Sequence, residues 1–138
     1  MQDWSDMNNT DDFVAYLWSE VSGYSKFGTY EGNGNADGPF VWCGFRPAFV
    51  MIKKYNTTDN WLMWDDERSA YNPADVKLAA NLTDEENSSS IGNTSYNMFD
   101  LVSNGFKIRS SASSANGSSD DFVFAAFADS PFKYANAR

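Results

Sequence analysis

Six short runs of aromatic and β-branched residues, each bounded by Gly, Asn, Asp or Ser, dominate this sequence. Such runs are typical of β-strands, because these side chains pack well on a pleated surface and the flanking residues favour turns. Many short strands without long helical segments indicate a sandwich or barrel. We therefore expect an all-β fold, an antiparallel β-sandwich of lectin-like or jelly-roll-like type. The expected strands lie near residues 13–18, 40–43, 48–54, 61–65, 105–109 and 122–128.

The length of 138 residues suffices for one domain with its own core but not for two. No apolar run approaches the ~20 residues of a membrane-spanning helix, and the first residues lack the basic and apolar regions of a signal peptide. Polar runs such as residues 87–90 and 110–119 predict long loops with little that could pack. Residues 73–81 predict a loop that contains a short helix, and we expect at most one short helix in the fold.

Charge and composition exclude several classes of function. Ten Lys and Arg against 19 Asp and Glu give a net charge of -9, and the basic residues are scattered, which argues against nucleic acid as a partner. The chain has no His, the usual general base and a common metal ligand. Its single cysteine, Cys43, lies in an aromatic run and is expected to be a small buried side chain. We expect no cofactor, no metal and no enzymatic activity.

The run at residues 11–20 is echoed at residues 120–129, and both copies begin Asp-Asp-Phe-Val. One interpretation is that residues 1–27 end a preceding unit and residues 28–138 form a further β-sandwich module. The other is that residues 13–18 are the first strand of a single sandwich. In either case we expect the strands at 13–18 and 122–128 to be paired in one sheet or equivalent in consecutive units. Phe13 and Phe122 are both expected to be buried.

An ordered series of motifs runs through nearly the whole chain. The motifs are FVAYLWSEVSGYSKF at 13–27, the glycine-rich run at 28–41, GFRPA at 44–48, the segment at 64–73, FDLVSNGFK at 99–107 and FADSPFKYANAR at 127–138. This series, which is more specific than any one motif, resembles a repeated module of bacteriophage tail-associated proteins, many of them from marine metagenomes. The resemblance implies a virion structural or adhesion module of a tail fibre or spike, and no catalytic residues can be carried over.

The loop at residues 33–38 presents Asn, Asn and Asp at alternate positions with Gly sixth, like the opening of a calcium loop. An EF-hand loop requires a bidentate Glu at its twelfth position, where this chain has Gly44. A glycine- and asparagine-rich connection between strands explains the pattern better.

The run that ends the strand at 61–65 carries the candidate ligand site. Alternation places Trp61 and Met63 on one face and Leu62 and Trp64 on the other, so one Trp is expected in the core and one nearer the surface. In the simpler interpretation, Asp65 and Arg68 form an ion pair that fixes the loop. In the functional one, aromatic faces stack on sugar rings while polar side chains bind hydroxyls. The candidate residues are Trp64, Asp65, Asp66, Arg68, Tyr71 and Asn72.

Three functions follow from these observations. The first is a host cell-surface module of a phage tail that binds carbohydrate, and the second is a structural spacer that packs against other copies in a homotrimer. A small glycan hydrolase is a distant third, since adjacent acids on a solvated loop usually form only a charged surface. A binding module must leave at least one aromatic exposed in a concave patch, whereas a spacer buries them. The candidate aromatics are Trp42, Trp61, Trp64 and Tyr71.

Overall fold

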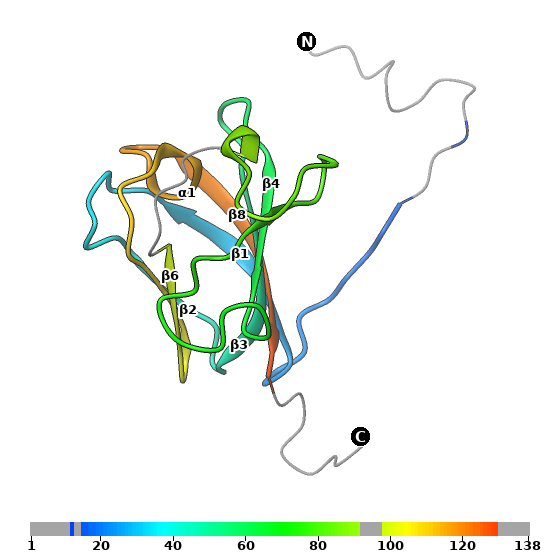
Figure 1. The fold of residues 1–138 in the computed structure, drawn as a ribbon. Coiled ribbons are helices and arrows are strands. Elements are labelled where there is room, and N and C mark those ends of the chain that lie inside the picture. Colours follow the sequence, from blue (N-terminus) through cyan, green and yellow to red (C-terminus); the bar gives the residue numbers. More distant parts are fainter. Residues whose placement is uncertain (1–11, 13–14, 92–97, 130–138) are drawn as a thin grey trace.

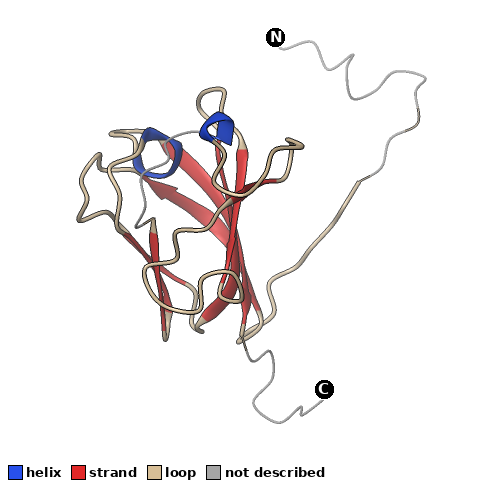
Figure 2. Cartoon of the chain, in the orientation of Figure 1, coloured by secondary structure: helices blue, strands red, loops and turns tan. Residues whose placement is uncertain are grey.

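The computed structural model describes residues 12, 15–91 and 98–129, which form two antiparallel sheets packed face to face (Figures 1 and 2). The five-stranded sheet has the order β1-β8-β3-β4-β5, and the three-stranded sheet has the order β2-β7-β6. The strands are β1 (Ser25–Glu31), β2 (Phe40–Trp42), β3 (Pro47–Lys54), β4 (Trp61–Asp65), β5 (Leu78–Ala79), β6 (Phe99–Val102), β7 (Gly105–Ile108) and β8 (Asp121–Ala128). One α-helix, α1 (Ser113–Asn116), and one 3-10 turn, η2 (Ser89–Ile91), are described besides them.

The large sheet is built around β8, which pairs with β1 on one side and β3 on the other. Alternate residues of β8 are buried, as expected for a strand with one face on a core. The inward residues are Phe122, Phe124 and Ala126.

Aromatic side chains from both sheets meet in the core. The ring centroids of Phe99 and Trp64 lie 4.4 Å apart, those of Phe99 and Phe106 lie 5.5 Å apart, and the pairs meet edge to face. Edge-to-face packing is favoured because the ring edge is positive and its face negative. The core therefore bridges β4, β6 and β7, and the prediction of an all-β antiparallel sandwich is confirmed.

Five of the six predicted strands are confirmed within one or two residues: 40–43, 48–54, 61–65, 105–109 and 122–128. The strand predicted at 13–18 is wrong over residues 15–18, which form no strand. These residues do not pair with β8, because both edges of β8 are occupied by β1 and β3. Phe122 is buried as expected, whereas Phe13 lies outside the described residues.

The strand that pairs with β8 at the sheet edge is instead β1, which spans the expected boundary between residues 27 and 28. Its interior Gly28 leaves room for Phe124: a Cβ on Gly28 would lie 2.9 Å from the Phe124 ring. A glycine inside a strand weakens the strand signal, although it permits this close approach. Whether residues 1–27 belong to a preceding unit stays a prediction.

The polar segments differ from the sequence-based expectation. The short helix predicted within 73–81 is wrong, since this segment contains only β5 and a bridge between Ala74 and Phe99. The serine-rich segment 110–119, expected to contain little that could pack, contains α1 and buries Ala112, Ala115 and Asn116. The side chains of this segment are small enough for its backbone to lie close to the glycine-rich loop at 33–38. The segment therefore packs because its side chains are small.

The outer face of the large sheet is apolar along its middle row. The registers place Phe27, Ala125, Met51, Met63 and Leu78 side by side across all five strands. All five side chains are half-buried. This face lies opposite the core and is a second apolar surface of the sandwich.

Candidate functional site

The predicted stacking residue Trp64 is fully buried in the core against Phe99. Its ring therefore has no face to offer a sugar, and its assignment to a ligand site is wrong. The expectation that one of the two Trp residues lies in the core and the other nearer the surface is confirmed, because Trp61 is 39% exposed. Alternation along β4 defined two faces but not which of them faced inward.

The charged residues after β4 form ion pairs among themselves. Arg68 Nη1 lies 2.6 Å from Asp65 Oδ2, and the Arg68 backbone N–H donates to Asp65 Oδ1 at 2.8 Å. Arg68 Nε also lies 2.9 Å from Glu86 Oε1, and Asp66 Oδ2 lies 2.7 Å from Arg46 Nη1. The simpler interpretation, an ion pair between Asp65 and Arg68 that fixes the loop, is confirmed.

The last two predicted residues are in different surroundings. The Asn72 side chain donates to the Leu101 carbonyl at 2.9 Å and accepts from the Leu101 N–H at 2.8 Å, so it continues the ladder at the outer edge of β6. Tyr71 is 87% exposed. A ligand role for Asp65, Asp66, Arg68, Tyr71 and Asn72 stays a prediction, and none of these five lines the three clefts described next.

An exposed tryptophan stands in a different place, at the edge of the small sheet. In β2 only Val41 points inward, so Phe40 and Trp42 point outward, and Trp42 is 59% exposed. Gly44, with φ +83°, bends the chain after β2, and a Cβ there would lie 3.0 Å from the Trp42 ring. The Trp42 ring therefore lies over a glycine, which keeps one wall of the adjacent cleft low.

This cleft, which we call the Trp42 cleft, has a volume of about 420 Å³. It lies between the turn before β1 and the end of β2. The residues that line it are Glu20, Ser22, Gly23, Ser25, Lys26, Trp42, Cys43 and Gly44.

Polar groups of fixed position face the tryptophan across the Trp42 cleft. Lys26 Nζ lies 2.9 Å from Glu20 Oε2, and the Phe27 N–H donates to Glu20 Oε1 at 3.3 Å. The hydrogen bond from Lys26 lowers the pKa of Glu20 below its ordinary value, with the Phe27 N–H adding to the effect. The cleft therefore presents an anionic carboxylate and an ammonium beside an aromatic face.

Cys43 lies at the base of this cleft but is only 4% exposed, as expected of a small buried side chain. Burial raises the pKa of its thiol to about 12, so the group stays protonated at neutral pH. A protonated, covered thiol is a poor nucleophile and a poor metal ligand. Cys43 therefore contributes packing to the cleft.

A second cleft of about 300 Å³ continues from the first, between β1 and β2. Lys26 and Trp42 line both clefts. The second is bounded by the backbone of β1 at Gly28, the outward side chain of Phe40 and the ring of Phe124. We call it the edge groove.

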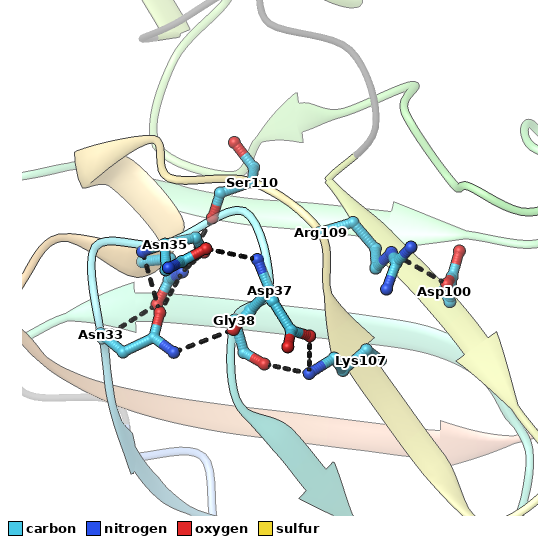
Figure 3. Close-up of polar contacts among 9 residues, drawn as sticks. Asn33, Asn35, Asp37, Gly38, Asp100, Lys107, Arg109 and Ser110 are labelled. Carbon is cyan, nitrogen blue, oxygen red and sulfur yellow. Dashed lines mark hydrogen bonds and ion pairs between the residues drawn. The ribbon is translucent and has the colours of Figure 1, made fainter.

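The outer face of the small sheet carries two further ion pairs, and one of them, Arg109 with Asp100, lines a third cleft of about 260 Å³ (Figure 3). Lys107 Nζ lies 2.7 Å from Asp37 Oδ1, and Arg109 Nε lies 3.3 Å from Asp100 Oδ2. The hydrogen bond from Lys107 lowers the pKa of Asp37. Lys107 in β7 and Arg109 directly after it are thus paired with acids from neighbouring segments.

The loop at 33–38 is held by hydrogen bonds within the protein (Figure 3). Asn33 Oδ1 accepts from the Asn35 N–H at 3.0 Å, and Asn35 Oδ1 accepts from the Asp37 N–H at 2.9 Å. The buried amide of Asn116 donates to Asn33 Oδ1 and to the Asn35 carbonyl. The oxygens that resembled calcium ligands therefore already accept protein hydrogen bonds, as in the simpler interpretation of this loop.

Among residues 12, 15–91 and 98–129, no group of three or more His, Cys, Asp or Glu is arranged to hold a metal ion. In the same ranges no helix has the length and apolar character needed to cross a membrane.

Trp42 is one of the four aromatics that the sequence offers for an exposed concave patch, but the sequence does not place it in the candidate ligand site. The reason is that β2 is only three residues long, too short for alternation to distinguish its faces. The one available signal was Gly44 close after it, a residue that often marks a bend or a close approach.

Comparison with known proteins places the chain in a family. No curated protein and no solved structure matches it. A family model described as a domain of unknown function, DUF7483, matches residues 2–131, nearly the whole chain. The chain therefore belongs to the DUF7483 family.

Proposed function

We propose that this domain binds carbohydrate in the Trp42 cleft without catalysing a reaction on it. The observation that carries the proposal is one exposed tryptophan in a concave site, opposite a paired carboxylate and ammonium. An aromatic face packs on the apolar face of a pyranose ring, while carboxylate, ammonium and hydroxyl groups hydrogen-bond the sugar hydroxyls. The Trp42 cleft offers both kinds of contact within one hollow.

The ionisation of the cleft suits binding better than hydrolysis. A glycosidase needs a carboxyl group with a raised pKa to protonate the leaving oxygen. The pKa of Glu20 is shifted the other way by Lys26. Glu20 is therefore suited to accept hydrogen bonds from hydroxyls.

The biological setting of the proposal is the host-binding part of a phage tail fibre or spike within the virion, with a host cell-surface glycan as partner. It rests on the resemblance of the motifs to phage tail-associated modules. A homotrimer is part of the same proposal.

The test is a glycan array followed by calorimetry on the best ligand, with wild type and three variants. Trp42→Ala is expected to weaken binding by about 1–3 kcal/mol, roughly 5- to 150-fold in Kd. Trp61→Ala is the matched control, because Trp61 is also exposed but lines none of the three clefts. Tyr71→Ala tests the site predicted from sequence. Undiminished binding by a folded Trp42→Ala variant would refute the proposed site.

A second candidate function is a structural module that packs against copies of itself. The observation that favours it is the apolar middle row on the outer face of the large sheet, centred on Met51. Light scattering on the purified chain tests it. If the row is an interface, Met51→Lys is expected to convert an oligomer to a monomer, while Trp42→Ala leaves the oligomer intact.

A further inference from the structure

We propose that the free edge of β1 is a docking surface for residues 15–20 of the same chain, which add to the large sheet as a further antiparallel strand. In the structure these residues run away from the two sheets (Figure 1, blue segment). Tyr16 is 75% exposed, Leu17 91% and Trp18 64%. The proposed closed arrangement differs from the structure in the direction of this arm before Val21. It also changes the acceptor of the Phe27 N–H, which donates to Glu20 Oε1 in the structure and would donate to the Ser19 carbonyl in the closed arrangement.

Among residues 12, 15–91 and 98–129, no strand pairs with the outer edge of β1. The Ala128 N–H donates to the Tyr24 carbonyl and the Gly32 N–H to the Asp120 carbonyl, so the even-numbered residues of β1 bond to β8. In an antiparallel pair the intervening residues point their N–H and C=O groups the other way. Those of Thr29 and Glu31 therefore point outward, toward the side where the edge groove lies.

The turn that joins the arm to β1 already sets the register. Val21 and Ser25 form an antiparallel bridge, in which the Ser25 N–H donates to the Val21 carbonyl at 2.9 Å. Extending this bridge by two residues at a time pairs residue 19 with 27, 17 with 29, and 15 with 31. These are the odd-numbered residues of β1, whose backbone groups point outward. The arm is thus in phase to complete the free edge without a bulge.

One side-chain pair of the closed arrangement is present in the structure. The same register places Glu20 opposite Lys26, and these two residues form the ion pair at 2.9 Å. It next places Trp18 opposite Gly28, on the face of β1 that looks toward Phe124. Gly28 carries no side chain there, so the indole of Trp18 would cover the glycine and enter the edge groove of about 300 Å³.

The exposed apolar side chains of the arm favour docking, and β8, the strand that it resembles, has no free edge to receive it. Three consecutive exposed apolar residues are unfavourable in water, and burying them is worth more than leaving them solvated. β8, which the arm resembles in sequence, has both edges occupied, whereas β1 has one free edge. The DUF7483 match begins at residue 2, so the arm belongs to the stretch that the family shares.

The own chain is favoured over a second copy because the turn at residues 22–24 is already closed. Because this turn is formed before the arm docks, docking within the chain adds no loop-closure entropy. Docking on a second copy must instead overcome the loss of translational freedom. The proposal does not rest on carbohydrate binding. The Glu20 and Lys26 pair is kept in either arrangement, while Trp18 would enter the edge groove, which shares Lys26 and Trp42 with the Trp42 cleft.

Paired cysteines test the register. Leu17→Cys with Thr29→Cys places two thiols on directly opposed residues, whose Cα atoms would lie about 5.5 Å apart in the closed arrangement, within the range of a disulfide. Leu17→Cys with Glu31→Cys is the control, because residue 31 lies two residues beyond the partner that the proposed register gives residue 17. We expect a monomeric, internally crosslinked product to form at least about tenfold faster in the first pair than in the second. Equal rates, or no crosslink, would overturn the proposal, and disulfide-linked dimers would show that the strand docks on a second copy instead.

Hydrogen exchange of the Thr29 amide is the second measurement and needs no crosslink. Docking protects this N–H because the Leu17 carbonyl accepts from it. Leu17→Pro removes the Leu17 N–H that would donate to Thr29 and leaves the sheets untouched. We expect the Thr29 amide to be protected in the wild type and to exchange about tenfold faster or more in Leu17→Pro. Fast exchange in both proteins would overturn the proposal.

Discussion

Replacing Asn116 by Ala is expected to destabilise the sandwich more than any other single change in the serine-rich segment. Asn116 is fully buried. Its amide nitrogen donates to Asn33 Oδ1 at 3.0 Å, to the Asn35 carbonyl at 2.7 Å and to the Ser110 carbonyl at 2.8 Å. Its Oδ1 accepts from the Asn33 N–H at 2.8 Å. One side chain thus ties the loop at 33–38 to the segment that follows β7.

The magnitude follows from counting what the amide can donate and accept. Two N–H hydrogens and one oxygen supply about three full hydrogen bonds, each worth about 1 kcal/mol net. Truncation also leaves the buried carbonyl of Ser110 short of a donor, for a further penalty of about 1 kcal/mol. We therefore expect a loss of about 3–4 kcal/mol, and for 138 residues this lowers Tm by roughly 10–13 °C.

Calorimetry and urea unfolding measure this loss directly. Ser111→Ala is the control, because Ser111 is exposed in the same segment and is expected to change stability by less than about 0.5 kcal/mol. A Tm decrease of under about 3 °C for Asn116→Ala would refute the reasoning, because it would mean that water replaces the amide at little cost.

Four further predictions concern the rest of the molecule. Cys43 is expected to react with iodoacetamide at pH 8 only as fast as the chain unfolds, because it is buried and its pKa is raised to about 12; rapid alkylation under native conditions, read by mass spectrometry, would contradict this. Burial raises the pKa of Tyr30 well above its ordinary 10.0, so the unfolded state ionises first. Stability should then fall above about pH 10 by up to ~1.4 kcal/mol per pH unit, and less steeply in Tyr30→Phe, as followed by urea unfolding at a series of pH values. Gly105→Ala is expected to lower Tm more than Gly23→Ala, although only Gly23 has a positive φ, because a Cβ on Gly105 would lie 2.1 Å from the Val41 carbonyl oxygen whereas one on Gly23 meets nothing. Thermal unfolding should be unchanged by EDTA, and a Tm lowered by more than the few degrees that correspond to about 1 kcal/mol would reveal a structural ion.

The longer strands β3, β4 and β8, in which buried and partly exposed residues alternate, could be predicted from sequence, whereas β1 and the short strands β5 and β6 could not. β3 alternates partly exposed and buried residues from Phe49 to Lys54, and β8 does so from Asp121 to Phe127. β1 carries Ser, Lys, Gly and Thr among its aromatics, so its pattern is weak. Its place in the sheet depends on a partner distant in sequence, β8, and on the fit of Gly28 to Phe124. The local periodicity of a sequence does not predict long-range packing of this kind.

The arm at 15–20 illustrates the converse error. Its composition is that of a strand, and the structure places it in none. A strand needs a partner edge as well as a suitable sequence, and sequence reports only the second. The same residues lie in phase with the free edge of β1. Their strand-like composition is therefore consistent with the docked strand proposed above.

The candidate site shows why aromatic content alone could not locate a binding surface. Trp64 and Trp42 have the same chemistry, and each stands in a short apolar run. Trp64 lies on the inner face of β4 and fills the core, whereas Trp42 lies on the outer face of β2 and lines a cleft. The two residues differ in which face of their strand they occupy relative to the core. A shift of one residue in a strand's register moves every side chain to the opposite face. The charged residues beside Trp64 have the chemistry of ligand groups, but in the structure Asp65 and Arg68 bind each other and fix the loop. A tryptophan followed two residues later by a glycine with positive φ, at the end of an edge strand, is the more informative pattern, because the bend exposes the ring and hollows the surface beside it.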